Sequence, residues 1–221
     1  MNEHPGDASS VHGVPTGHGH ADPESPPFGK RYWEDHWARA GRRAPAPANP
    51  YVVSATADLP PGSALDAGCG VGAEAIALAE RGWNVTGADI SPAALSTARA
   101  RTEGAAARIE WVEADLTRWE PERTWDLVVT NYAHPDSGQL AFYRRLASWV
   151  APGGSLLVIA HAAGGGHGHH PVEAMASADG VAGVLPSDEW VIDLSEEHDR
   201  EVARGAQTLG LRDLVVRARR R

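Results

Sequence analysis

Hydrophobic and polar positions follow two alternating patterns over most of the chain. Short apolar runs typical of buried strands alternate with stretches in which apolar residues recur at helical spacing. Strands that alternate with helices indicate right-handed βαβ crossovers, and therefore an α/β fold with a doubly wound, mostly parallel sheet and helices on both faces. The expected strands are residues 64–67, 83–88, 108–112, 125–130 and 155–160, and the expected helices between them are residues 72–81, 91–101 and 137–150.

The segments on either side of this repeat have other patterns. Residues 28–40 place aromatic side chains at helical spacing, and Asn49-Pro50 has the N-cap and first-position residues of a second helix. Residues 190–194 and 211–218 have the pattern of two strands with no clear helix between them. This pattern predicts an antiparallel pair at one edge of the sheet.

A glycine- and histidine-rich stretch, residues 164–170, predicts a loop, and a short helix is expected around residues 172–178. Histidine is a common zinc and nickel ligand, but a glycine-rich stretch provides no preformed geometry, so we predict no metal site. The lone cysteine, Cys69, excludes an internal disulfide and a cysteine zinc cage.

The domain organisation follows from composition. Residues 1–27 are rich in Gly, Pro, Ser and His and have almost no apolar periodicity, so we expect them to be disordered. Residues 28–221 are expected to form one domain, which suits a chain of 221 residues. No apolar run approaches the ~20 residues that span a bilayer, and no signal peptide is visible, so we expect a soluble, cytoplasmic protein without a membrane partner.

The charge balance argues against one class of partner. The chain has 29 acidic and 20 basic residues, for a net charge of -9 with histidine neutral. Because affinity for duplex nucleic acid depends largely on Lys and Arg at phosphates, we expect no nucleic-acid partner. One basic cluster is expected to be a solvated strand end: Arg217, Arg219, Arg220 and Arg221.

Chemically useful residues fall where the expected strands end. In a doubly wound sheet, ligands bind outside the carboxyl ends of the strands. Gly68, Gly70 and Gly72 follow the first strand, where glycines allow a sharp turn and a close approach to a ligand. Asp89 ends the second strand, where a carboxylate can accept hydrogen bonds from both hydroxyls of a ribose. Asp115 follows the third strand and can accept one from an adenine amino group.

The glycine turn alone fits two classes of cofactor. Residues 68–73 (GCGVGA) also satisfy the dinucleotide pattern G-x-G-x-x-A, and the spacing to Asp89 suits NAD as well. Asp66 favours S-adenosylmethionine (SAM), because a carboxylate repels a pyrophosphate but suits ammonium and sulfonium charges. Asp115, a further acid, points the same way. The hypotheses are a SAM-dependent methyltransferase, an NAD-dependent oxidoreductase and a non-catalytic SAM-binding protein.

Several segments together resemble the motifs of the class I SAM-dependent methyltransferases. The similar segments are residues 64–72 (motif I), 82–91 (the second-strand motif), 114–116 (the adenine-contacting segment), and 125–129 with 150–157 (the fourth- and fifth-strand motifs). The resemblance extends over about residues 28 to 219. Within the class, the chain is similar to small bacterial methyltransferases of the tellurite-resistance and thiopurine-methylating type.

The resemblance implies a Rossmann-like, seven-stranded sheet with the last strand antiparallel, and SAM as the cofactor. The stretch Asn131-Tyr132-Ala133-His134 departs from the Asn/Asp-Pro-Pro-Tyr/Phe motif of amino- and base-methylating relatives, which argues against such substrates. By motif match, the implied cofactor-binding residues are Asp66, Gly68, Cys69, Gly70, Gly72, Asp89, Ile90, Asp115, Leu116 and Asn131.

The acceptor is expected to be a small molecule with an O, N or S nucleophile, bound by a monomer or homodimer. A base is needed only if the acceptor must lose a proton, and the histidines placed for this role are His134, His161 and His36. The candidates for substrate contact or a lid are Tyr32, Trp33, Trp37 and Tyr132, although a helix packed on the core explains the spacing of the first three equally well. The tryptophans expected in the core are Trp111, Trp119, Trp125 and Trp149.

Overall fold

A computed structural model describes residues 28–40, 47–102, 109–163, 174–204 and 207–221. The predicted disordered segment, residues 1–27, and the predicted glycine- and histidine-rich loop, residues 164–170, lie outside these ranges. The domain boundary at residue 28 therefore stays a prediction.

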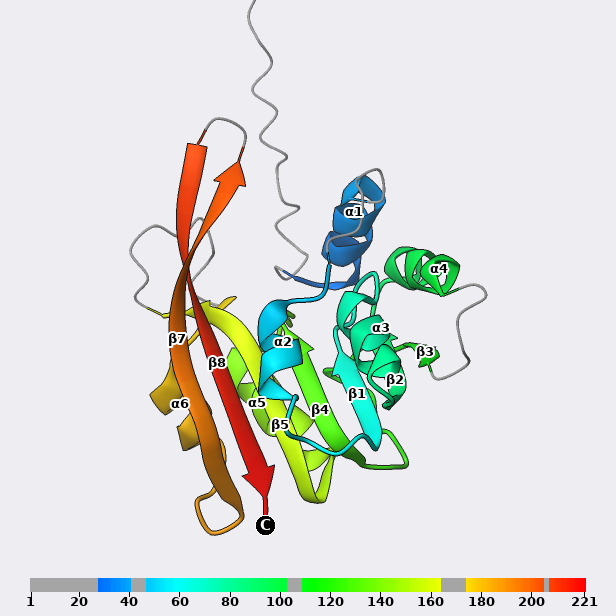
Figure 1. Cartoon of the computed structure of the whole chain (residues 1–221). Helices are drawn as coiled ribbons and strands as arrows, with labels where there is room; N and C mark the ends of the chain where they lie inside the picture. Colours follow the sequence, from blue (N-terminus) through cyan, green and yellow to red (C-terminus); the bar gives the residue numbers. More distant parts are fainter. Residues whose placement is uncertain (1–27, 41–46, 103–108, 164–173, 205–206) are drawn as a thin grey trace, which may run out of the picture.

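One mixed sheet forms the centre of the molecule (Figure 1). Its strands lie in the order β3-β2-β1-β4-β5-β8-β7, and β6 also pairs with β5. Neighbours among β1 to β6 are parallel, whereas β8 is antiparallel to both β5 and β7. The bounds are β1 (Ser63–Ala67), β2 (Asn84–Asp89), β3 (Ile109–Glu113), β4 (Trp125–Asn131), β5 (Val150–Ala162), β6 (Met175–Ala176), β7 (Trp190–Arg204) and β8 (Gln207–Arg220). The α/β prediction is confirmed; among the described residues the sheet has eight strands rather than seven, because the two-residue β6 joins β5.

Helices cover both faces of this sheet. Side chains of α2 and α3 pack with Leu157 and Ile159 of β5, whereas those of α5 and α6 pack with its alternate residues, Leu156 and Val158. This alternation follows from the two-residue period of a strand. The helices are α1 (Lys30–Ala40), α2 (Pro50–Ala55), α3 (Ala73–Glu80), α4 (Pro92–Arg101), α5 (Gln139–Ser148) and α6 (Ala178–Gly183).

Helix starts follow the capping residues in the sequence. The Asn49 side chain accepts a hydrogen bond from the Tyr51 amide, and the Ser91 side chain accepts one from the Ala94 amide. Each cap is followed by a proline at the first helical position, where its fixed φ fits and its missing N–H costs nothing. The predicted cap of α2 is confirmed.

Several boundaries were predicted wrongly; β7, for example, extends to Arg204 rather than ending at residue 194. In the range expected to be helical, residues 172–178, the described residues Met175–Ala176 form β6, and the helix α6 begins only at Ala178 after the cap Ser177. Strand β5 begins at Val150, five residues before the expected start. Val150 pairs with Trp125, and a register shift then accommodates the turn-forming residues 152–154.

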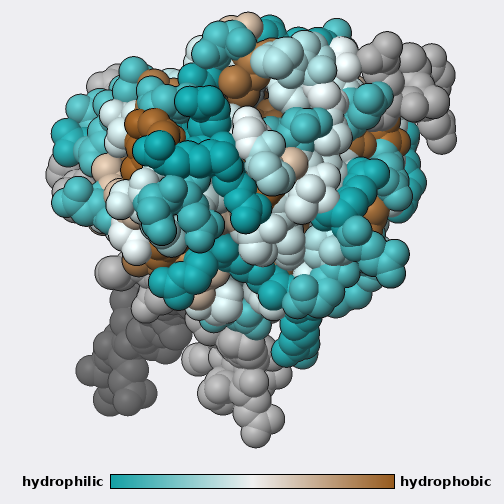
Figure 2. All heavy atoms as spheres, turned by 90° about the horizontal axis from the view of Figure 1, so that it is seen from below, coloured by the Kyte–Doolittle hydropathy of each residue, from teal (hydrophilic) through white to brown (hydrophobic). Residues whose placement is uncertain are grey.

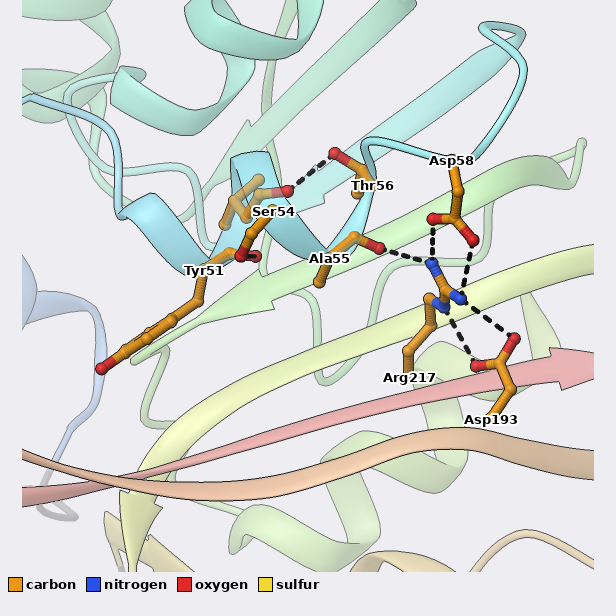
Figure 3. A network of polar contacts seen from close by, with 8 residues as sticks. Tyr51, Ser54, Ala55, Thr56, Asp58, Asp193 and Arg217 are labelled. Atoms are coloured by element: carbon orange, nitrogen blue, oxygen red, sulfur yellow. Dashed lines mark hydrogen bonds and ion pairs between the residues drawn. The ribbon is translucent and has the colours of Figure 1, made fainter.

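Arg217 of β8 joins three segments and is not the solvated side chain expected from the sequence (Figure 3). Its guanidinium donates to both carboxylate oxygens of Asp58, to Asp193 of β7 and to the Ala55 carbonyl at the end of α2. Only 11% of the Arg217 side chain is exposed. The contacts fasten α2 to the antiparallel edge of the sheet.

The two ends of the sheet differ. Figure 1 shows α1 above the carboxyl ends of the parallel strands. Figure 2 views the opposite end, where hydrophilic residues predominate and hydrophobic residues form separate patches. The large hydrophobic side chains exposed among the described residues are scattered: Tyr32, Leu140 and Ile192.

Candidate active site

The glycine turn connects β1 to α3 and is hydrogen-bonded to the end of β2. Gly68, Gly70 and Gly72 have φ values of 81°, 50° and 80°, in the left-handed region that favours glycine. The amides of Gly68 and Cys69 donate to the Ala88 carbonyl at 2.9 and 3.0 Å. The turn therefore has a fixed shape before any ligand arrives.

Close packing is a second reason for these glycines. A Cβ on Gly68 would lie 2.5 Å from the Ala133 side chain, and one on Gly72 would lie 2.4 Å from the Trp111 ring. A Cβ on Gly70 would lie 2.6 Å from the Trp37 ring of α1. Real Cβ contacts are never that short, so the turn is held between the loop after β4, β3 and α1.

Asp66 of β1 is a buried carboxylate at the base of this turn. It is 1% exposed, and its Oδ2 has no hydrogen-bond partner among the described residues. Burial raises its pKa well above the ordinary value, and the charge of Glu74 in the first turn of α3 adds to this, while the Ala75 amide opposes it. A buried carboxylate oxygen that has no donor, as Oδ2 has none here among the described residues, favours a cationic ligand.

Asp89 at the end of β2 accepts two backbone hydrogen bonds. Its Oδ2 accepts from the Gly70 amide at 2.8 Å and its Oδ1 from the Ser91 amide at 2.9 Å. Burial nevertheless raises the pKa of Asp89, and Glu34 of α1 adds to the increase through its charge. Each carboxylate oxygen retains a lone pair for a further donor. The next residue, Ile90, is half-buried.

Asn131 lies in a polar network that also includes two residues missed in the sequence. Its Nδ2 donates to Glu74 Oε1, and its Oδ1 accepts from Asn49 Nδ2, both at 3.0 Å. The backbone N–H of Asn49 donates to the same Glu74 oxygen at 3.0 Å. Asn49 was predicted only as a helix cap, and the position of Glu74 just after the glycines was the signal that could have marked it.

Asp115 and Leu116 have structural contacts of their own in the loop after β3. Asp115 Oδ1 accepts from the Thr117 amide at 3.0 Å and from its hydroxyl at 2.6 Å. Leu116 is 7% exposed and belongs to the core on the α5 side, and its carbonyl accepts from Arg145. Their contact with adenine stays a prediction.

Two of the three candidate histidines lie together, His134 in the loop after β4 and His161 near the carboxyl end of β5. The ring centroids of His134 and His161 are 5.8 Å apart, and the Tyr132 ring stacks on His161 at 4.5 Å. His161 Nδ1 lies 3.8 Å from Oδ1 of Asp213, which is fully buried on β8. Tyr132 has a φ of 52°, a left-handed conformation uncommon for a bulky residue.

Asp213 could not be paired with His161 from the sequence, because 52 positions separate them (213 minus 161) and the antiparallel register alone brings them opposite each other. On the other side of this pair, Gln139 Nε2 lies 2.7 Å from His134 Nδ1 and 3.1 Å from the Ala133 carbonyl. In the contact between Gln139 and His134, the tautomer of the His134 ring decides which nitrogen donates.

Helix α1 contacts both the glycine turn and the loop after β4. Trp37 packs on Gly70, and Trp33 Nε1 donates to the His134 carbonyl at 3.2 Å. Tyr32 is 46% exposed and stacks with His36. The Trp33 ring contacts both His36 and His134, with centroid distances of 5.5 and 6.2 Å.

The strand order, with antiparallel β8 between β5 and β7, and the glycine turn after β1 define the fold of the class I SAM-dependent methyltransferases. Residues 64–154 match a family model described as a methyltransferase domain. Over these residues the chain is similar to the class I SAM-dependent methyltransferases, whose cofactor is SAM.

Two curated relatives are similar over part of their length. A protein described as "Probable thiol methyltransferase 2" from Arabidopsis thaliana is 31% identical over 137 residues, which cover 58% of this chain and 60% of the relative. Trans-aconitate 2-methyltransferase from Methylobacterium radiotolerans is 40% identical over 103 residues, which cover 44% of this chain and 37% of the relative. The chain thus spans 60% or less of the length of these relatives.

Solved structures share the fold over most of the chain. One comes from work on the conversion of a disulfide bond into a thioacetal group during echinomycin biosynthesis, with 25% identity, a TM-score of 0.66, and coverage of 86% of this chain and 92% of that chain. TehB from Haemophilus influenzae has 16% identity and a TM-score of 0.69, covering 86% and 67%. Magnesium protoporphyrin IX methyltransferase from Synechocystis, solved with bound SAM, has 20% identity and a TM-score of 0.61, covering 87% and 95%.

The described residues contain neither a membrane-spanning helix nor a cluster of metal ligands. None of the described helices is long and apolar enough to cross a membrane. Within the same ranges, no group of three or more His, Cys, Asp or Glu side chains is placed to hold a metal ion.

Proposed function

We propose that the protein transfers the methyl group of SAM to a small-molecule acceptor with an O, N or S nucleophile. The observation that carries the proposal is Asp66, whose Oδ2 is buried without a hydrogen-bond partner among the described residues. Burial raises its pKa, and the charges of Glu74 and Asp89 raise it further, so three acidic side chains lie at the glycine turn. Such a site attracts an ammonium or sulfonium group and repels the pyrophosphate of NAD, which the alternative oxidoreductase would bind.

The proposed cofactor contacts follow the motifs. Asp66 and the amide of Asn131 hold the methionyl end, and the glycine turn, including Cys69, lies along the methionyl and ribose portions. Asp89 accepts from the ribose hydroxyls, with Ile90 beside the ribose and Asp115 and Leu116 at the adenine. The lone pairs left on Asp89 after its bonds to Gly70 and Ser91 support this role.

Bound SAM supplies a methyl group already activated by its sulfonium. The protein then has to orient the acceptor atom toward that methyl group and exclude water. Trp33 and Trp37, together with Tyr32 and Tyr132, are the proposed cover over the acceptor. Their support is the contact of α1 with both the glycine turn and the loop after β4.

A proton-bearing acceptor would also need a base. We assign this role first to His161, because Asp213 lies behind its Nδ1 and a carboxylate there orients the ring and stabilises its cation. His134 is the second candidate, and His36 on α1 is the third. Burial and the charge of Arg39 lower the pKa of His36, which keeps it neutral and able to accept a proton.

The small-molecule acceptor class is supported by the relatives, two of which are described as thiol and trans-aconitate methyltransferases. None of the described residues distinguishes a thiol acceptor from a carboxylic acid acceptor. A cytoplasmic location and a monomeric or homodimeric state remain part of the proposal.

Binding and turnover test the proposal in two stages. Calorimetry with S-adenosylhomocysteine (SAH) and NAD⁺ should give micromolar binding of SAH and none of NAD⁺; the reverse would establish the oxidoreductase alternative. A panel of thiols, phenols, carboxylic acids, amines and metalloid anions is then incubated with SAM and read by mass spectrometry. Binding without turnover on any acceptor would indicate a non-catalytic SAM-binding protein. For a proton-bearing acceptor, His161→Gln should keep SAH affinity and lose at least about tenfold in kcat.

A further inference from the structure

The inward face of α1 carries a carboxylate for which the described residues offer no hydrogen-bond donor. Glu34 Oε1 is buried and has no hydrogen-bond partner among them. Residues three apart on a helix share a face, so Glu34 lies beside Trp37, whose ring packs on Gly70. The Gly70 amide in turn donates to Asp89. Glu34 and Asp89 therefore approach the same part of the turn from opposite sides, one from α1 and one from β2.

Among the described residues, the lysine one turn before Glu34 is bound elsewhere. Lys30, one turn before Glu34, is close enough to feel its charge, but its ammonium is bound to Glu113 of β3 at 2.7 Å. The charge of Glu34 instead reaches Asp89 and adds to the increase in the pKa of that carboxyl. A ligand with two O–H groups would give the Glu34 oxygen a donor and Asp89 a further one, and would offset the repulsion between the two charges.

Asp89 can also accept only a limited number of further hydrogen bonds. Each of its oxygens already accepts one backbone N–H, from Gly70 and from Ser91. A ribose presents two adjacent hydroxyl donors. A second acceptor on the other side of the sugar would allow one hydroxyl to bond to each carboxylate.

We propose that Glu34 is a second ribose-binding carboxylate, so that α1 is part of the cofactor site and the ribose hydroxyls lie between Glu34 and Asp89. This inference rests on the proposed function, because it requires SAM at the glycine turn. It makes the aromatic helix a closing element for the cofactor as well as a cover for the acceptor.

The first test uses calorimetry to compare SAH binding by three proteins: the wild type, the Glu34→Gln variant and the Asp35→Asn variant. Gln keeps the size of the side chain and removes the charge. Asp35→Asn makes the same charge change one residue along, on the exposed face of α1. The expected result is SAH affinity about tenfold weaker in Glu34→Gln and within about twofold of wild type in Asp35→Asn, since a hydrogen bond to a charged acceptor is lost only in the first. Equal or tighter binding by Glu34→Gln would overturn the inference.

The second test separates a hydroxyl contact from a structural role. SAH analogues that lack the 2′ or the 3′ hydroxyl are titrated into the same proteins. The loss caused by Glu34→Gln should fall to about twofold or less with the analogue that lacks the hydroxyl held by Glu34. If the loss is the same for SAH and both analogues, Glu34 only stabilises α1, and the inference is wrong.

Failure of the proposed function gives a different result. Absence of SAH binding in the wild-type protein would remove both proposals together. Wild-type binding with no effect of Glu34→Gln removes only the second. Thermal melts of each variant without ligand establish that the folded fraction is equal.

Discussion

The acidic residues in the two halves of the sheet have opposite environments and opposite pKa shifts. In the half formed by β1 to β4, Asp66 and Asp89 are buried and their pKa values are raised by burial. In the half formed by β5, β7 and β8, Arg217 of β8 binds Asp193 of β7 and also Asp58, which lies between α2 and β1, and its hydrogen bond lowers the pKa of Asp58. The same kind of side chain thus marks a ligand site where its charge is unbalanced, and a structural contact where an arginine balances it.

The backbone differs in the same way. Strands β1 to β4 have five to seven residues and end at the glycine turn or at a polar loop, whereas β5, β7 and β8 have 13 to 15 residues and pair in long antiparallel registers. The first half has the geometry of a cofactor site, whereas the second is a supporting edge that also carries His161 and Asp213. Variants in the two halves should therefore affect different properties.

The largest expected effect is at the glycine turn. Gly72→Ala would require a left-handed alanine whose Cβ lies 2.4 Å from the Trp111 ring, so we expect a loss of about 3 kcal/mol or more in the free energy of unfolding. Chemical denaturation measures it. Gly153→Ala is the matched control, because Gly153 has the same φ of 80° with nothing within 4 Å of its Cβ. Its cost should be about 1–2 kcal/mol. Equal losses in the two variants would contradict the packing of Trp111 against the turn.

An effect of opposite sign is expected at Asp66. Because burial raises the folded-state pKa of this carboxyl, its contribution to stability is full below the ordinary carboxyl pKa and is lost as the pH rises through the raised value. Asp66→Asn removes the buried charge and should stabilise the ligand-free protein by about 1–3 kcal/mol at neutral pH. The gain should disappear near pH 4. The same variant should bind SAH about tenfold more weakly, since the acceptor for the ammonium is changed. Stabilisation without weaker binding would remove Asp66 from the cofactor site.

The smallest expected effect is at the supporting edge. Arg217→Leu removes the contacts to Asp58, Asp193 and Ala55 (Figure 3), and we expect a loss of about 1–2 kcal/mol, because partly exposed ion pairs contribute little individually. The pKa of Asp58 is lowered, so the stabilisation is present above the ordinary carboxyl pKa and is lost as the pH falls through the lowered value. SAH affinity should not change. Arg219→Leu on the exposed side of β8 serves as the control, and a loss as large as that of Arg217→Leu would show that the contacts in Figure 3 are not the cause.

The sequence was informative where structure depends on local rules. The strand and helix repeat, the caps Asn49 and Ser91 and the glycine turn all follow from neighbouring residues, and the fold was predicted correctly from them. Predictions were wrong at β6 and at the start of β5, because two-residue pairing and a register shift depend on a partner strand.

The site residues missed in the sequence have the same explanation. Glu34, Glu74 and Asp213 carry no motif, and each reaches its partners through the packing of a separate element. The proposed surroundings of the acceptor come from α1, from the loop after β4 and from β8. Because they do not form one continuous stretch of chain, no local sequence pattern identifies the acceptor.

The insertion of β8 between β5 and β7 has a consequence for the way the chain folds. During synthesis, the hydrogen-bonding edge of β5 is complete before its neighbour exists, because β8 follows β7 in the chain but precedes it in the sheet. Until residues 207–220 arrive, that edge is a template open to any other extended segment, including another copy of the protein. Nascent chains that stall before β8 should therefore be especially prone to aggregation and should depend on chaperones more than the finished protein does.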